Sequence, residues 1–331
     1  MAEPLLSVEN LKTYFFIGSA ISRAVDGVSF TVARGETLGL VGESGCGKTV
    51  SSLSIMRLVP SPPGRIIGGR ILFDGRDLLT LRDEDMRRVR GREIGMVFQE
   101  PMTSLNPVYT IGYQIAEVLL THTGITHSEA YKRAEELLSR VKMPAPAKQL
   151  ACYPHELSGG LRQRVMIAMA VACQPKLLIA DEPTTALDVT IQAQILELFQ
   201  ELKATLGMSM LLVTHNLAVV AEVADAIAVM YAGYIVEYAE TRNLFAEPIH
   251  PYTVGLLTAV PTIARKSERL EAIPGNVPDP ADKPPGCPFH PRCYLRRKLG
   301  TRVCDEQVPD ITQCGPRHWV RCWNAPREHG K

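Results

Sequence analysis

Short apolar runs, interrupted by Gly and Asp, recur through the first hundred residues of the chain. They lie at residues 24–30, 37–41, 68–75 and 94–98. Runs of this length with such interruptions are typical of β-strands bounded by turns. The pattern therefore predicts strands in this part of the chain, and the strand at 37–41 ends directly before a glycine-rich stretch.

The residues between 101 and 157 have a helical periodicity instead. Within 128–141 the apolar residues recur every three or four positions, and Glu and Arg occupy positions between them. This spacing places the apolar residues on one face of a helix, and Ser128 is a suitable N-cap. We expect a helical subdomain inserted into an α/β core. The expected buried face consists of Ala130, Ala134, Leu137, Leu138 and Val141.

Buried strands return in the second half of the chain. The run 177–180 ends in two adjacent carboxylates, Asp181 and Glu182, and a further run lies at 226–230. From about residue 248 the composition shifts to Pro, Arg and Cys. The sequence thus predicts an α/β domain at 1–247 and a C-terminal extension at 248–331.

The composition restricts the class of protein. The chain has 331 residues, of which 46% are hydrophobic, and this is ample for a buried core. A net charge of +1 gives no general case for binding nucleic acid. Because the sequence shows neither a signal peptide nor an apolar run of membrane-spanning length, we expect a cytosolic chain unless a partner holds it at a membrane.

The glycine-rich stretch covers residues 42–49 and reads Gly-Glu-Ser-Gly-Cys-Gly-Lys-Thr. It has the pattern G-x-x-x-x-G-K-[ST] of a phosphate-binding loop. Glycines allow consecutive backbone N–H groups to curl around phosphate oxygens, and the N-terminus of the following helix adds partial positive charge. Lys48 is expected to pair with the β and γ phosphates, and Thr49 to offer its hydroxyl to Mg²⁺.

Residues 158–160, with the sequence Ser-Gly-Gly, form a second candidate anion site because they precede a long apolar helix. The carboxylates Asp181 and Glu182 follow a buried strand, and ligands of open α/β sheets gather at that edge. Asp181 can hold the Mg²⁺ shell, and Glu182 can polarise an attacking water. A P-loop kinase or GTPase would explain residues 42–49 but not the Ser-Gly-Gly turn.

Three further residues of the sequence, Gln99, Asp188 and His215, belong to the same set of motifs. The ordered set resembles the nucleotide-binding subunit of ABC transporters over essentially the whole chain. The resemblance implies a P-loop NTPase core with an antiparallel β subdomain and a helical subdomain, and it implies ATP hydrolysis with Mg²⁺. It assigns catalysis to Glu182 as the general base, together with Lys48, Gln99 and His215.

Nucleotide binding is expected at the phosphate loop and at the other motifs. Tyr14 is added because an aromatic ring ahead of the loop could stack on the base, although a ring at a strand end is as often part of a core. For Mg²⁺ the expected ligands are Thr49, Gln99 and Asp181. The nucleotide-binding residues are Tyr14, Gly42, Glu43, Ser44, Gly45, Cys46, Gly47, Lys48, Thr49, Val50, Gln99, Ser158, Gly159, Gly160, Asp181 and Asp188.

Two positions depart from the commonest pattern of the family. In the family, the segment that corresponds to residues 157–161 is called the signature. Leu161 stands where this signature most often has Gln, but residues 158–160, which are expected to contact phosphate, are kept. Cys46 replaces a frequent Ser, and only its backbone is needed there. A thiol at a helix N-terminus could have a lowered pKa and be oxidisable.

The resemblance also implies a mechanism and partners. Two such subunits meet head to tail, so that ATP at residues 42–49 of one is covered by residues 158–160 of the other. Closure on ATP and opening after hydrolysis move two transmembrane permease subunits. The second ATP-binding subunit is expected to be a paralogue. The chain is then expected as a peripheral subunit at the cytoplasmic face of the inner membrane.

Residues 99–107, 250–253 and 286–293 are similar to segments of ABC importers of the dipeptide and oligopeptide type. This similarity implies peptide import, with an extracytoplasmic peptide-binding protein as a further partner. Nickel and other small-solute importers share part of these motifs and stay an alternative. A non-transport ATPase acting on nucleic acid would usually show two cassettes or a long coiled coil, so no nucleic-acid partner is expected.

Five of the eight cysteines lie after residue 286, in a Pro-rich segment with little apolar content. A bound metal would supply stability that such a segment lacks. Four thiolates suit Zn²⁺ or an iron–sulfur cluster, and the resemblance favours a [4Fe-4S] cluster, with zinc next and free thiols last. His290 and His318 are interpreted as exposed. The expected ligands are Cys287, Cys293, Cys304 and Cys322, with Cys314 as the spare cysteine.

Overall fold

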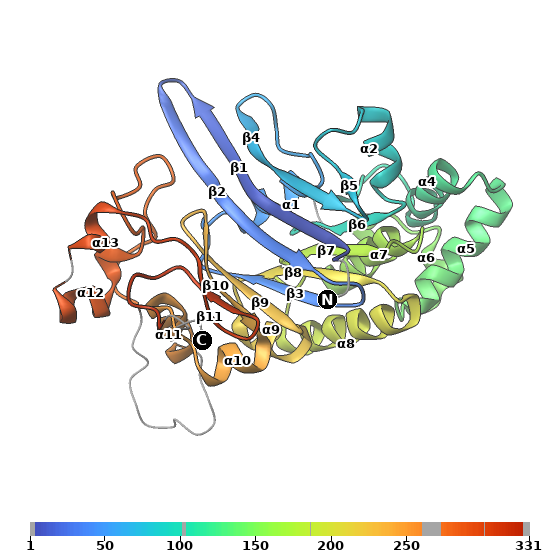
Figure 1. Cartoon of the computed structure of the whole chain (residues 1–331). Coiled ribbons are helices and arrows are strands. Elements are labelled where there is room, and N and C mark those ends of the chain that lie inside the picture. Colours follow the sequence, from blue (N-terminus) through green and yellow to red (C-terminus); the bar gives the residue numbers. More distant parts are fainter. Residues whose placement is uncertain (1–3, 101–103, 186, 260–272, 301, 327–331) are drawn as a thin grey trace. The chain divides into compact units, whose positions relative to one another are not determined.

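The structure, a computed structural model, describes residues 4–100, 104–185, 187–259, 273–300 and 302–326 (Figure 1). The chain divides into two compact units. The first consists mainly of residues 33–36 and 80–213, and the second of residues up to 32, 37–79 and 214 onwards. Residues 101–103, at the predicted start of the helical subdomain, and Ala186 lie outside the described residues.

Parallel strands form the centre of the first unit. β6 (Ile94–Val97) pairs with β7 (Leu177–Asp181), and β7 pairs with β8 (Ser209–Thr214). Every residue of β7 and β8 is buried, as expected for strands of a parallel sheet. The other elements of this unit are α2 (Asp83–Val89), α4 (Ile111–Thr123), α5 (His127–Arg140), α6 (Pro146–Gln149), η1 (Pro154–Glu156), α7 (Gly159–Val171) and α8 (Val189–Leu206).

The predicted helical face within 128–141 is confirmed in α5, but its predicted cap is wrong. Ala130, Ala134, Leu137 and Leu138 are the buried residues of the helix. The helix begins one residue before Ser128, and Thr126 is its N-cap, with a side chain that accepts a hydrogen bond from the Glu129 N–H. Thr126 and Ser128 both have a hydroxyl group that suits an N-cap. Thr126 is the cap because the helix begins at His127.

An antiparallel sheet forms one layer of the second unit. Its strand order is β2-β1-β4-β5, and this confirms the predicted antiparallel subdomain. The strands predicted at 24–30 and 68–75 each begin four residues earlier, at Ala20 and Gly64, because pairing with β1 continues through stretches in which most residues are exposed. The bounds are β1 (Leu6–Ile17), β2 (Ala20–Val32), β4 (Gly64–Phe73) and β5 (Arg76–Asp77).

A second group of strands in this unit carries the phosphate loop. β3 (Thr37–Val41) pairs in parallel with β9 (Ala226–Tyr231), and β9 forms an antiparallel hairpin with β10 (Tyr234–Glu240). The C-terminal extension adds β12 (His318–Val320) to β10, and β11 (Thr312–Gly315) to β12. The helices are α1 (Lys48–Ile55), α9 (Leu217–Val223), α10 (Thr241–Ala246), α11 (Pro251–Thr258), η2 (His290–Arg292), α12 (Tyr294–Leu299) and α13 (Val303–Glu306).

The extension has an apolar contact surface that its composition alone did not predict. Tyr252 and Phe289 are buried in one cluster with Val41 and Tyr231 of the strands. The Tyr231 ring lies 4.6 Å from Tyr252 and 5.2 Å from Phe289 between ring centroids. The extension is poor in apolar residues, but it buries them against β3 and β9 as well as against one another.

In the described part of the chain, we find no helix with the length and apolar character that crossing a membrane requires.

Candidate active site

The phosphate loop connects β3 to α1 in the second unit, as predicted. β3 is buried along its whole length, and α1 begins at Lys48 directly after Gly47. Gly47 has φ +109°, and a Cβ there would lie 2.3 Å from the carbonyl oxygen of Ala24. Only glycine fits at this position, because the backbone is left-handed and the backbone of β2 lies too close for a side chain.

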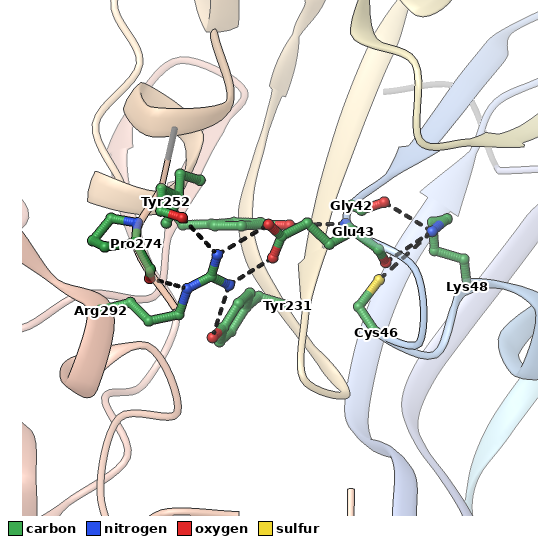
Figure 2. Close-up of polar contacts among 9 residues, drawn as sticks. Gly42, Glu43, Cys46, Lys48, Tyr231, Tyr252, Pro274 and Arg292 are labelled. Atoms are coloured by element: carbon green, nitrogen blue, oxygen red, sulfur yellow. Dashed lines mark hydrogen bonds and ion pairs between the residues drawn. The ribbon is translucent and has the colours of Figure 1, made fainter. Parts of the chain in front are cut away.

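The Lys48 side chain is folded back into the loop. It is 4% exposed, and its Nζ donates hydrogen bonds to the carbonyl oxygens of Gly42 at 2.8 Å and Glu43 at 3.1 Å (Figure 2). The backbone carbonyl groups of Gly42 and Glu43 therefore hold the lysine side chain within the loop. An ammonium group fixed in this way is suited to pairing with phosphate oxygens at the start of α1.

Cys46 does not have the lowered thiol pKa that its position at a helix N-terminus could have given. The residue is fully buried, and burial raises the pKa of its thiol more than the neighbouring Lys48 lowers it. The position at the start of a helix favours a thiolate only where water or a donor also solvates the charge. Cys46 fills space beneath the loop, within 2.8 Å of where a Cβ on Gly42 would lie.

Tyr14 lies on β1 in the same unit, and its hydroxyl has a partner within the protein. It donates a 2.7 Å hydrogen bond to Asp26, whose other oxygen accepts from Tyr234 at 2.7 Å. Burial, followed by the bond to Asp26, raises the pKa of Tyr14 to about 12, so the phenol is neutral. The Arg23 guanidinium carbon lies 6.0 Å from the ring centroid. Stacking of Tyr14 on a base stays a prediction.

Gln99 and Glu182 meet in the first unit. The Gln99 Nε2 donates to the Glu182 carboxylate at 3.2 Å, and the Thr185 hydroxyl donates to the same oxygen at 3.0 Å. Glu182 follows β7 with φ +46°, and its N–H donates to the Val213 carbonyl oxygen at 2.8 Å. Asp181, which is 2% exposed, is the last residue of β7.

The Ser-Gly-Gly turn and Asp188 line one pocket of about 490 Å³ in the first unit. Asp188 is the N-cap of α8 and accepts a 2.9 Å hydrogen bond from the Ile191 N–H. Ser158 is the N-cap of α7, and none of its side-chain atoms makes the capping bond. A Cβ on Gly160 would lie 2.9 Å from Ile191. A side chain at this position would therefore require Ile191 to shift.

The same pocket contains two cationic residues that the sequence reasoning missed. Lys142 and Arg164 both line it. Arg164 is fixed by hydrogen bonds to the Val141 carbonyl oxygen at 2.7 Å and to the Gln194 side chain at 2.9 Å. Arg164 follows Leu161, the last residue of the signature, by three positions. Its place one helical turn after the glycines was the signal that the sequence offered.

His215 is exposed in the second unit, directly before Asn216. The Asn216 side chain caps α9 by accepting a 3.0 Å hydrogen bond from the Ala218 N–H. The capped turn fixes the backbone on which the histidine stands.

The four predicted cluster cysteines gather in the second unit. Burial, and then the neighbouring Cys322, Cys304 and Cys293, raise the pKa of Cys287 to about 12. Similar causes raise the pKa of Cys322 to about 11, and there Cys314 is the weakest neighbour. None of the eight cysteines forms a disulfide. Among the described residues, however, no group of three or more His, Cys, Asp or Glu side chains could hold a metal ion.

The interpretation of the two histidines as exposed is wrong. His318 is 6% exposed, and its Nε2 lies 2.7 Å from the carboxylate of Glu237, which is fully buried. His290 lies 2.9 Å from the Cys287 carbonyl oxygen through Nδ1 and 3.8 Å from Asp305 through Nε2. Proline-rich surroundings suggested a loose surface, but the His290 ring links residues within the extension, and the His318 ring links the extension to β10.

Comparison with protein families identifies two regions. The model of the ABC transporter family matches residues 25–185, and that of the oligopeptide/dipeptide transporter C-terminal region matches residues 236–299. The second match begins in β10, before the composition shift at residue 248.

Relatives match over nearly the whole chain. The oligopeptide transport ATP-binding protein AppD of Bacillus subtilis is 56% identical over 289 residues, which are 87% of this chain and 88% of that protein. The dipeptide transport ATP-binding protein DppD of Bacillus subtilis is 50% identical, with 97% and 95% covered. The probable peptide ABC transporter ATP-binding protein y4tR of Sinorhizobium fredii is also 50% identical, with 98% and 96% covered.

Solved ABC cassettes have the same fold. A dimeric post-hydrolysis state of the ATP-binding cassette MJ0796, bound to ADP and Pi, matches with a TM-score of 0.65 and 28% identity over 72% of this chain and 99% of that one. The cbiO1 protein of Clostridium perfringens, part of the cbiONQ transporter complex, gives a TM-score of 0.62 and 28% identity, with 74% and 92% covered.

Proposed function

The chain belongs to the ABC transporter ATP-binding family, and from this premise we propose that it hydrolyses ATP to power the import of dipeptides and oligopeptides. The observation that carries the proposal is the oligopeptide/dipeptide transporter C-terminal region at residues 236–299, next to a complete set of ATPase motifs. Relatives that match most of this chain at about half identity are named as peptide, oligopeptide or dipeptide transport ATP-binding proteins. A nickel or other small-solute importer is the alternative.

The proposed roles of the residues follow from their local geometry. Lys48, already held at the start of α1, pairs with the β and γ phosphates, and the Thr49 hydroxyl joins the Mg²⁺ shell. Asp181 at the end of β7 contributes to that shell. Glu182 accepts the proton of the attacking water, while Gln99, bonded to its carboxylate, fixes the orientation of that carboxylate.

We propose that the pocket formed by residues 158–160 and Asp188 serves a second ATP-binding subunit. Helix N-termini supply N–H donors and partial positive charge, which suits the γ-phosphate of a nucleotide on the partner. A dimeric, related cassette bound to ADP and Pi supports this assembly. The remaining proposed partners are two permease subunits and an extracytoplasmic peptide-binding protein, with the chain peripheral to the membrane at its cytoplasmic face.

The test of the ATPase function uses the native complex, purified by pull-down with its membrane and solute-binding components identified. Glu182→Gln should reduce ATP hydrolysis at least about a hundredfold, because it removes the general base. The partner's equivalent glutamate must be disabled in all samples. Glu84→Gln, the same change at an exposed position of α2, should leave the rate unchanged. Equal rates for both variants would refute the assigned mechanism.

For the extension we propose a [4Fe-4S] cluster on Cys287, Cys293, Cys304 and Cys322. The support is that none of the four forms a disulfide and that they are neighbours, since the others contribute to the raised pKa of Cys287 and of Cys322. The described side chains contain no group of three or more His, Cys, Asp or Glu that could hold a metal ion, so the proposal rests on the cysteines of the sequence, and zinc is the alternative. Such a cluster would supply a covalent link between segments of the extension.

Anaerobically purified protein should absorb visible light and contain iron and sulfide. Cys304→Ser should abolish both signals, whereas Cys152→Ser, far from the extension in sequence, should retain them. A colourless and iron-free preparation of the unmodified chain would overturn this proposal.

A further inference from the structure

Arg292 lies in η2 of the extension, but its guanidinium contacts the phosphate loop (Figure 2). Its Nη1 and Nη2 donate to the two carboxylate oxygens of Glu43 at 2.6 Å and 3.0 Å. Arg292 is 6% exposed. This is a paired, two-bond contact of the kind that fixes both distance and orientation.

The remaining donors of Arg292 are also used within the protein. Nε donates to the Pro274 carbonyl oxygen at 2.9 Å, and Nη1 lies 3.4 Å from the Tyr231 hydroxyl. The guanidinium carbon is 5.7 Å from the Tyr231 ring centroid. Contacts with the extension and with β9 therefore orient the side chain in addition to its contact with Glu43. Its position does not depend on the loop alone.

Glu43 receives a contact on each of its polar groups. Arg292 binds the carboxylate, and the Tyr252 hydroxyl accepts a 2.9 Å hydrogen bond from the backbone N–H. The backbone carbonyl accepts the 3.1 Å bond from Lys48. One residue thus connects the arginine of the extension to the lysine of the loop.

The groups that hold Glu43 come from a packed aromatic cluster. Tyr252 in α11 and Phe289 before η2 lie 5.4 Å apart between ring centroids, and both pack on Tyr231 of β9. A close-packed cluster of this kind resists local displacement. It provides a rigid base from which the extension acts on the loop.

We propose that Arg292 is a positioning residue for ATP binding: it fixes Glu43, and through the backbone of Glu43 it sets the position of Lys48. The inference rests on the proposed function of the loop and deepens it, because it makes the extension part of the nucleotide site. Neither Arg292 nor any other residue of the extension needs to touch ATP for this effect. Glu43 is then the residue through which the conformation of the extension affects the loop.

The test compares binding of Mg-ATP by the full-length chain and its variants, measured by calorimetry. Arg292→Ala should raise the Kd about tenfold, because a half-buried carboxylate loses its partner and the loop relaxes. Arg292→Lys keeps the charge but not the two-bond geometry, so its Kd should lie between those of the unmodified chain and Arg292→Ala. Glu43→Gln, which retains the side-chain shape, should behave like Arg292→Lys.

Arg296→Ala is the matched control within the extension. Arg296 also forms an ion pair, with Nε 2.9 Å from Asp305, and both partners belong to the extension. Its loss should lower the melting temperature without changing the Kd for Mg-ATP. An effect of Arg296→Ala equal to that of Arg292→Ala would overturn the inference, because Arg292 would then only stabilise the extension.

A double-mutant cycle separates coupling from coincidence. If Arg292 acts through Glu43, the variant with both Arg292→Ala and Glu43→Ala should bind Mg-ATP no more weakly than the worse single variant. Additive losses, or an unchanged Kd in Arg292→Ala, would refute the inference while the unmodified chain still binds Mg-ATP. Failure of the unmodified chain to bind, with Lys48→Ala as the reference for lost binding, would refute the proposed function itself.

Discussion

At the residue scale, the chemistry of a side chain follows its burial more than its sequence neighbours. Cys46 has the sequence position of a reactive thiol, yet it is fully buried and its pKa is raised. His318, placed among exposed residues by its context, instead lies against the buried Glu237. Neither outcome follows from residue type and spacing, because the elements that cover these side chains are distant in the sequence.

His250 leads to a prediction at the same scale. It is the N-cap of α11, where its Nδ1 accepts a 3.0 Å hydrogen bond from the Tyr252 N–H. Burial lowers its pKa to about 4, and Arg321 adds to this, although Glu237 opposes it. The unfolded chain, with a pKa of about 6.5, binds this proton first, so stability is lost as the pH falls from 6.5 towards 4.

The loss should reach about 3 kcal/mol at most, since each unit of pKa difference is worth about 1.4 kcal/mol. Urea unfolding at several pH values measures it. His250→Asn keeps a capping oxygen and removes the titrating group, and its stability should depend less on pH over this interval. A variant with the same pH dependence as the unmodified chain would show that other groups cause the acid sensitivity.

At the scale of the element, the sequence predicted what depends on local pattern. The strands at 37–41 and 94–98, the start of α1 after Gly47 and the buried face of α5 were all predictable from apolar spacing and glycine chemistry. The cap of α5 was not, since Thr126 and Ser128 are equally suitable and the difference is one of helix register. Helix ends are decided by contacts beyond the local pattern.

The site followed the same division. Motif spacing was sufficient to predict that Lys48, Glu182 and the Ser-Gly-Gly turn each lie at the end of a strand or the start of a helix, while their roles stay predictions. The contact between Arg292 and Glu43 spans 249 positions and depends on how the extension packs on β9. Such a pair carries no periodic signal, so a single sequence could not predict it.

For the whole molecule, the central question is whether the predicted domain of residues 1–247 is stable without the extension. A chain ending at residue 247 would lose Tyr252 and Phe289 from the buried cluster and β12 from its pairing with β10. Uncovering Tyr231 and the edge of β10 exposes apolar surface and unpaired backbone groups. We therefore expect this shortened chain to melt at a lower temperature and to aggregate.

Thermal unfolding and light scattering of the two chains provide the measurement, and the full-length Arg292→Ala variant is the control. That variant removes the ion pair but keeps the aromatic cluster and β12, so its melting temperature should lie closer to that of the unmodified chain. If the shortened chain instead melts like the full-length protein, residues 1–247 fold independently, and the packing of the extension adds no stability to them. The expected order follows from the buried area: the cluster and the strand pairing involve far more of it than one arginine does.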